Sequence, residues 1–302
     1  MKAVPYWSVF VSFPPIVCGL PGWPMGGTIV AGNAVQFDRD SWEANLARPN
    51  ATGSNAIVGF DLSRQWPSAQ VDGWHLSINV TSDISDLQAM NPSNATGKSF
   101  TGTSIFLQAP DNLRTAFDDE NALDETTWKI CVVVIPDAPQ DNATAAGDGD
   151  CAVLSPQCVD DLQQAYKDKF PRNQDCYGTP PPTPASCGDG INTGAFNVQQ
   201  LPLDSIAGRE VFVTASDAHD PDDERSWDEA RQKTWPVLTI WGWNARADAP
   251  DDASPTVQLS CISARDVETP ADGDSPDSAG PRLGSSGVAA LAVASVAGYI
   301  LL

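Results

Sequence analysis

Histidine and basic residues are scarce in this chain. Its 302 residues include 2 histidines, His75 and His219, and 17 lysines and arginines against 39 aspartates and glutamates. A serine–histidine–aspartate triad would have to use one of these two imidazoles, and no G-x-S-x-G turn surrounds any serine. The formal net charge of −22 opposes binding to nucleic acid, because neutralisation of phosphates by lysine and arginine dominates that binding.

Several other signatures are missing. The chain has no glycine-rich phosphate loop, no C-x-x-C pair and no dinucleotide fingerprint, so we expect no cofactor. No internal repeat and no heptad run is present, which disfavours solenoids, propellers and coiled coils. The acidic stretch 217–224 (DAHDPDDE) is dense in the oxygen ligands that Ca²⁺ prefers, but its spacing matches no EF-hand. We interpret it as a solvated loop and assign no metal site.

One long uncharged run closes the chain, at residues 288–302 (VAALAVASVAGYILL). The small residues Ser278, Ala279 and Gly280 lie upstream of it, followed by a short spacer. This order is typical of a glycosylphosphatidylinositol (GPI) attachment signal, in which the tail is replaced by a lipid. Fifteen helical residues rise about 22 Å, short of the roughly 30 Å hydrocarbon core, so a plain membrane span is the second interpretation. Ser278 is the preferred attachment residue, with Gly273 and Gly280 as alternatives.

The first 34 residues are interpreted as a signal peptide and leader. Lys2 is followed by a mostly apolar stretch, and the cleavage site is ambiguous between about Gly19 and Ala34. Prolines inside the apolar stretch of a signal peptide are unusual. A misassigned start codon would also produce such an irregular leader. Cys18 falls in the leader.

The remaining cysteines form an even set. In an exported chain we expect them to make three disulfides, with fifteen connectivities open. One candidate pairing joins Cys151 to Cys158, Cys176 to Cys187, and Cys131 to Cys261. Four N-glycosylation sequons agree with export, at Asn50, Asn79, Asn94 and Asn142.

Short strand-like segments dominate the middle of the chain. Segment 74–80 alternates apolar and polar residues, as a half-buried strand does, and 128–135 is nearly continuous β-branched sequence, typical of a central strand. Together they favour a mainly β fold over residues 35–265, a β-sandwich with a barrel as the second choice. The full set of expected strands is 56–60, 74–80, 104–108, 128–135, 210–214, 237–243 and 256–262.

One short helix is expected, inside a disulfide-stapled, proline-rich insertion at residues 137–190. Ser155 can cap it, Pro156 occupies its first turn and Pro171 ends it. After the last expected strand, residues 266–287 contain mostly Pro, Gly, Ser and Asp, which predicts a flexible acidic stalk.

Two residue types are candidates for binding or catalysis. The chain has 10 tryptophans, and Trp241 and Trp243 lie two apart on one strand, so an outward face would make them a platform for sugar rings. On an inward face they would be core. Glycoside hydrolysis needs two nearby carboxylates, and Glu210, which opens an expected strand, is the first candidate. The abundance of acidic residues prevents a choice, so no catalytic residue is assigned.

The whole layout, from leader through acidic β domain and sequons to stalk and tail, resembles GPI-anchored surface proteins of filamentous fungi. The resemblance rests on no diagnostic motif and implies an extracellular location at the plasma membrane or cell wall. Two hypotheses follow. The first is a glycoprotein held to the membrane by its lipid anchor, with a structural or carbohydrate-binding role and wall glycans as partners. The second is a secreted hydrolase acting on wall polysaccharide, which predicts two convergent carboxylates, one with a raised pKa.

Overall fold

The computed structural model describes residues 28–31, 35–91, 95–116, 126–140, 151–173, 176, 180–188, 191, 197–200 and 209–266. Several predictions lie outside these residues: most of the leader, Asn94, Asn142, almost all of the stalk, Ser278 and the apolar tail. Among the helices within the described ranges, none is both long and apolar enough to cross a membrane.

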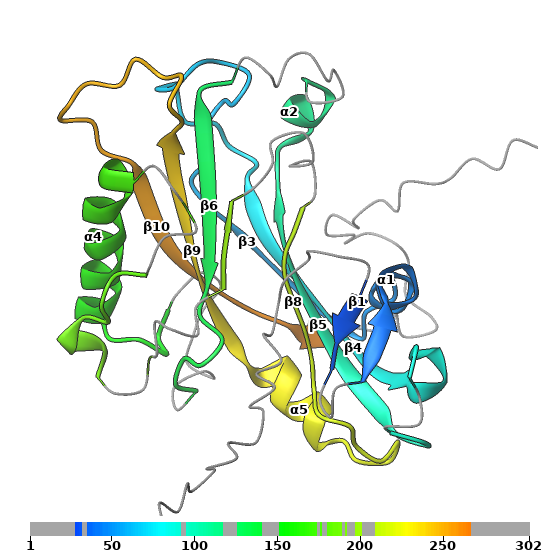
Figure 1. Ribbon diagram of the computed structural model, residues 1–302. Helices are drawn as coiled ribbons and strands as arrows, with labels where there is room; N and C mark the ends of the chain where they lie inside the picture. Colours follow the sequence, from blue (N-terminus) through cyan, green and yellow to red (C-terminus); the bar gives the residue numbers. More distant parts are fainter. Residues whose placement is uncertain are drawn as a thin grey trace, which may run out of the picture. The chain divides into compact units, whose positions relative to one another are not determined.

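The fold is a β-sandwich of two antiparallel sheets, as predicted (Figure 1). Neighbouring strands pair antiparallel throughout both sheets. One sheet has the order β10 (Thr256–Ser263), β9 (Thr234–Trp243), β6 (Trp128–Val134) and β7 (Asn197–Gln200). The other has the order β11 (Arg265–Asp266), β3 (Ala51–Ala56), β4 (His75–Ser85), β5 (Ser99–Gln108) and β8 (Arg209–Ala215).

Alternating side chains of β4 build the core between the sheets. Leu76, Ile78 and Val80 are fully buried there, against apolar residues of β6 and β9. The predicted central strand is confirmed, because β6 pairs with β9 on one side and β7 on the other and is buried on both faces. The second face of this sheet carries a separate apolar cluster beneath a helix.

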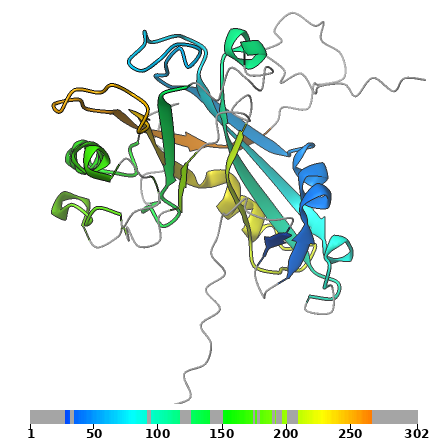
Figure 2. The ribbon, with the colours of Figure 1, turned by 45° about the horizontal axis from the view of Figure 1, so that its top comes forward.

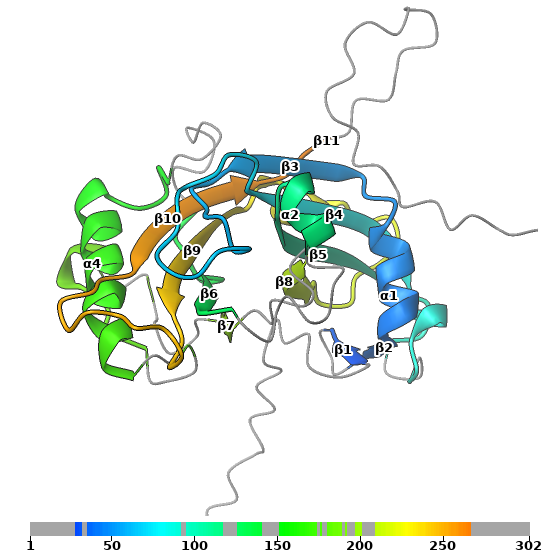
Figure 3. The ribbon, with the colours of Figure 1, turned by 90° about the horizontal axis from the view of Figure 1, so that it is seen from above.

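The first predicted strand, 56–60, is wrong: the strand is β3, at Ala51–Ala56. Its sequence, ATGSNA, has little β propensity, and tertiary contacts make it extended. Gly53 packs so closely on β10 that an added Cβ would lie 2.0 Å from the carbonyl oxygen of Ser263. From β10 the chain continues into β11, which joins the other sheet beside β3 (Figure 3).

The prediction of a single helix is also wrong. The described helices are α1 (Arg39–Leu46), α2 (Asp111–Ala116), α4 (Pro156–Asn173) and α5 (Arg225–Gln232), with short 3₁₀ turns η2 (Asp86–Gln88) and η5 (Ala185–Cys187). Helix α1 lies on the outer face of the five-stranded sheet, where Trp42 packs over Gly102. Helices α4 and α1 flank the two sheets on opposite sides (Figure 2). At eight residues, α1 and α5 are too short for sequence periodicity to reveal them.

Helix α4 begins as predicted. Ser155 Oγ accepts a hydrogen bond from the amide of Cys158 at 3.1 Å, and Pro156 is the first helical residue. The helix continues through Pro171 to Asn173, two residues beyond the predicted stop. It docks on β9 where Phe170 covers Gly242, at which a Cβ would lie 2.2 Å from the ring.

All six predicted cysteines form disulfides, but the candidate pairing is wrong. The bonds are Cys131–Cys176, Cys151–Cys261 and Cys158–Cys187. The predicted bond between Cys131 and Cys261 fails because β9 lies between β6 and β10. Two strand spacings are about 10 Å, whereas bridged Cα atoms lie within roughly 7 Å.

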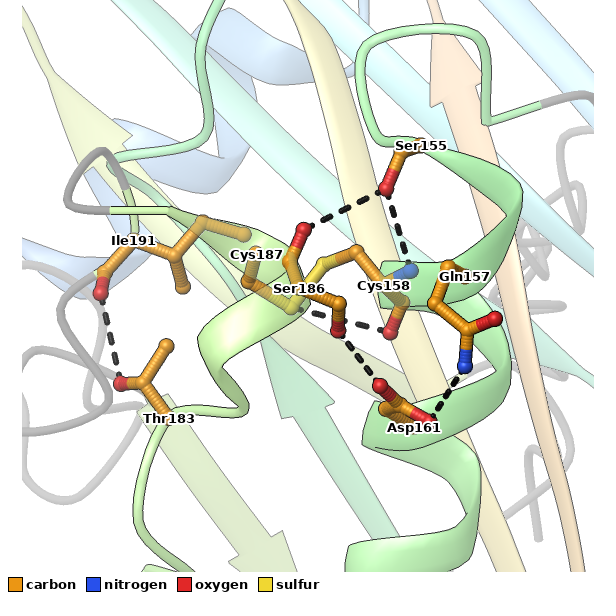
Figure 4. The surroundings of a disulfide bond; sticks show 8 residues. All are labelled: Ser155, Gln157, Cys158, Asp161, Thr183, Ser186, Cys187 and Ile191. Carbon is orange, nitrogen blue, oxygen red and sulfur yellow. Dashed lines mark hydrogen bonds between the residues drawn. A yellow bond between two sulfur atoms is a disulfide. The ribbon is translucent and has the colours of Figure 1, made fainter.

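The Cys158–Cys187 bond fastens η5 to the first turn of α4 (Figure 4). Around it, Ser186 Oγ donates to Asp161 Oδ2 at 2.6 Å and Gln157 Nε2 donates to Asp161 Oδ1 at 2.8 Å. These contacts tie the two parts of the insertion to each other, and the other two disulfides tie it to β6 and β10 of the four-stranded sheet.

The fold begins before residue 35. Strand β1 (Thr28–Val30) pairs antiparallel with β2 (Gln36–Asp38), and Ala31 and Val35 are buried beside Trp42. The described fold therefore includes residues that were predicted to belong to the leader.

Candidate functional site

A cavity of about 620 Å³ lies between α5 and the five-stranded sheet. Helix α5 packs against β5 and β4, and Trp227 and Ala230 join the apolar core between the sheets. The cavity is therefore built on the inner face of the sheet. Its lining consists of Asn50, Ser82, Asp83, Thr101, His219, Pro221, Asp222, Asp223, Glu224, Trp227, Asp228 and Arg231.

A β-bulge in β4 supplies one wall. The pairing of β4 with β5 shifts register between Thr81 and Ile84, and Asp83 adopts the left-handed conformation with φ of 56°. Aspartate tolerates this conformation better than most residues, and bulges re-aim side chains near binding sites. Ser82 Oγ donates to Asp83 Oδ2 at 2.9 Å, which places a hydroxyl and a carboxylate together on this wall.

Helix α5 and the turn before it supply the opposite wall. Asp223 Oδ1 accepts from the amide of Arg225 at 3.0 Å, which holds the turn against the start of the helix. Trp227 is half-buried and Asp228 follows it, paired with Arg231 at 3.0 Å. An aromatic ring and an ion pair thus face the cavity from one helix.

His219 lines the cavity and is 8% exposed. Its backbone pairs in both directions with Ser99, which extends the sheet beyond β8. Nδ1 lies 3.0 Å from the carbonyl oxygen of Asp220, and Nε2 lies 3.4 Å from Thr101 Oγ1. The hydrogen bond from Lys98, at 2.6 Å, lowers the pKa of the exposed Asp220.

The cavity lining is strongly acidic. Asp83, Asp222, Asp223, Glu224 and Asp228 contribute carboxylates, and Arg231 is the one lysine or arginine among the lining residues. Within the described ranges, no three His, Cys, Asp or Glu side chains are placed to hold a metal ion. Carboxylates, an amide and hydroxyls around an aromatic ring can hydrogen-bond a polyhydroxylated ligand, and their charge favours cations over anions.

Trp241 and Trp243 are core residues and make no platform. They are 1% and 3% exposed, and β9 is buried along its whole length. Trp241 packs edge-on against Trp74 at 4.8 Å between ring centroids, and Trp243 lies 4.5 Å from Trp66 and 5.4 Å from Phe170. Both are therefore unavailable to a sugar ring.

Glu210 lies away from the cavity, on the outer face of the five-stranded sheet. Its carboxylate accepts from Ser104 Oγ at 2.5 Å and from Arg39 Nη2 at 2.5 Å. Ser104 and Thr101 are three residues apart on β5, so they point to opposite faces. Arg39 also pairs with Glu43 at 2.6 Å. Burial raises the pKa of Glu210, but the group is enclosed by structural contacts that hold α1 to the sheet.

The raised pKa of Glu210 predicts a pH dependence of stability. A carboxyl whose folded pKa exceeds the unfolded value binds more protons when folded, so its contribution to stability falls as the pH rises through that interval. We expect the free energy of unfolding of wild type, relative to Glu210→Gln, to decrease as the pH rises above about 4.5. Urea denaturation of both proteins over a series of pH values measures this difference. A difference that stays constant or grows with pH would show that Arg39 dominates instead.

The sequence indicated part of this site and missed the rest. The acidic stretch was noted from the sequence, and the structure places it beside Trp227 of α5 in the cavity lining. Asn50, Ser82 and Thr101 come from three other segments, and only the sequon at Asn50 marked any of them. The acidic stretch was expected to be a solvated loop, but its histidine, His219, is buried. His75 is half-buried, with Nε2 2.7 Å from Gln108 Oε1.

Comparison of the chain with models of known protein families, with curated proteins and with solved structures finds no match. The function is therefore argued from the geometry and charge of the cavity.

Proposed function

We propose that the protein is an exported, GPI-anchored surface glycoprotein that binds carbohydrate in the cavity between α5 and the five-stranded sheet. The three disulfides indicate an oxidising compartment. The terminal tail, the stalk and the sequons support anchorage at the plasma membrane or cell wall. Wall glycans are then the polymers within reach of the cavity.

The observation that carries the carbohydrate proposal is the position of Trp227 among polar groups. Trp227 lines the cavity and is half-buried, so part of an aromatic side chain is available there for a sugar ring to stack on. Asn50, Ser82 and Thr101 supply neutral donors and acceptors around it, and the carboxylates accept hydrogen bonds from hydroxyls. Because the ring also packs on the core, its orientation is set by the fold before any ligand arrives.

The charge of the lining selects among sugars. Five lining carboxylates against Arg231 repel uronic acids and attract amino sugars. We therefore propose that oligomers of glucosamine bind most tightly, neutral N-acetylglucosamine oligomers less so, and galacturonate oligomers least. Raising the ionic strength should reduce the difference in affinity between these oligomers, since salt screens the exposed charges.

The test compares two substitutions in the cavity with one outside it. Trp227→Ala should weaken binding of glucosamine oligomers by about tenfold or more, through loss of stacking. Asp222→Asn, at an exposed residue, should weaken glucosamine oligomers by about three- to fivefold and leave the N-acetylated oligomers unchanged. Asp251→Asn removes an exposed carboxylate outside the lining and serves as the matched control. Isothermal titration calorimetry measures all three.

A reducing-sugar assay on the same samples separates binding from hydrolysis. Binding without release of reducing ends supports the proposal. Turnover that one carboxylate substitution abolishes would favour the hydrolase hypothesis, and equal affinity of wild type and Trp227→Ala would reject this cavity as the site.

A further inference from the structure

Asn50 is placed to carry a glycan. It is the exposed residue just before β3, and Thr52 completes its sequon. Its side-chain Oδ1 accepts a hydrogen bond from the backbone amide of Ser82 at 2.9 Å, and its own backbone amide donates to the carbonyl oxygen of Val80. Nδ2, the atom that bonds to an N-linked sugar, has no hydrogen-bond partner among the described residues.

Asn79 is placed differently. It is half-buried in β4, and its Nδ2 donates to the carbonyl oxygen of Leu46 at 3.2 Å, at the end of α1. A sugar on that atom would replace this hydrogen bond and displace α1 from the sheet. The folded, secreted protein should therefore be unmodified at Asn79, although its sequon is intact.

The Asn50 side chain is also part of the cavity lining, beside Asp83. We propose that Asn50 is N-glycosylated and that the first sugars of its glycan occupy the mouth of the cavity, where they compete with external carbohydrate. The inference rests on the proposed carbohydrate-binding function and adds a regulator of that site. Wherever the glycan is absent, the cavity is open to wall polymers.

The position of Asn50 and the chemistry of the first sugar both support this competition. Ser82 holds the Asn50 amide against the β4 bulge, so the sugar leaves from a fixed point on the cavity wall rather than from a free loop. An N-linked glycan begins with N-acetylglucosamine, which is neutral and rich in acceptors and hydroxyls. Because it is neutral, the carboxylates of the lining do not repel it. It can contact the same carboxylates and the same Trp227 ring that we propose bind external amino sugars.

The test uses the full chain secreted from a eukaryotic host, as wild type, Thr52→Ser and Thr52→Ala. Serine keeps the sequon and alanine removes it, and both leave Asn50 in place. Peptide mass spectrometry should find Asn50 modified in wild type and Thr52→Ser, and Asn79 unmodified. Glucosamine oligomers should bind Thr52→Ala about tenfold more tightly than the other two.

Hydrogen exchange without added oligosaccharide gives a second readout. Amides of α5 and of residues 217–224 should exchange more slowly in wild type than in Thr52→Ala, because the glycan covers them. If no form binds oligosaccharide but this difference persists, the proposed function fails and the glycan assignment stands. An unmodified Asn50, or equal exchange together with equal affinity, overturns the inference.

Discussion

Replacing Cys151 and Cys261 together with alanine is expected to lower the free energy of unfolding by about 4 to 5 kcal/mol. This bond closes a separation of 110 residues and ties the start of the insertion to β10. Constraint of the unfolded chain grows with the length of the closed loop, so a long bridge stabilises more than a short one. Guanidinium denaturation without reductant measures the loss.

The matched control is the double alanine variant at Cys158 and Cys187, which opens a separation of only 29 residues. It should cost about 3.5 kcal/mol, less than the longer bridge. If the shorter bridge proved the more stabilising, loop closure would not be the governing effect, and native contacts of η5 with α4 would have to account for it.

Replacing Trp241 with alanine is expected to cost about 3 to 5 kcal/mol, within the range for aromatic residues removed from a packed core. The side chain is 1% exposed and its ring contacts Trp74 and Phe60, with centroids 4.8 and 5.8 Å away. The cavity left by its removal would lie between the two sheets, where neither can collapse without disturbing strand pairing. Chemical denaturation should show a lower midpoint with an unchanged slope.

Two comparisons make the Trp241 prediction specific. Trp241→Phe should cost much less, because the aromatic packing survives and the buried Nε1, which has no partner among the described residues, is removed. Trp227→Ala should lower stability by less than Trp241→Ala, since Trp227 is only half-buried, while it weakens the proposed carbohydrate binding. A Trp241→Ala protein as stable as wild type would contradict the packing described for β9.

The two tryptophans of β9 show where sequence patterns lose information. Alternation distinguishes an inner from an outer face only when one face meets water. Here the core between the sheets covers one face of β9 and α4 covers the other, so both faces are apolar. Val237 and Leu238 are equally buried although they point in opposite directions. No local pattern could have told a binding platform from core.

The disulfide pairing was beyond the sequence for a related reason. The residues that bond were correctly identified, because an even set of six cysteines without metal-ligand spacing is typical of paired disulfides. The pairing of the cysteines depends on the order of the strands in the sheet. The position of β9 between β6 and β10 is a property of the whole sheet and of no short segment. The same non-local assembly places Asn50, Thr101 and Asp228 around one cavity although they lie far apart along the chain.

Local signals alone determined the mainly β class, the alternating strand β4, the start of α4 at Ser155 and Pro156, and the acidity of the segment before α5. Each of these depends on neighbours within a few residues, where propensity, capping and charge act directly. Tertiary structure alone decided the pairing of the cysteines, the burial of Trp241 and Glu210, and the cavity beside Trp227. Those properties depend on which distant strands come to lie side by side, and no short stretch of sequence specifies that.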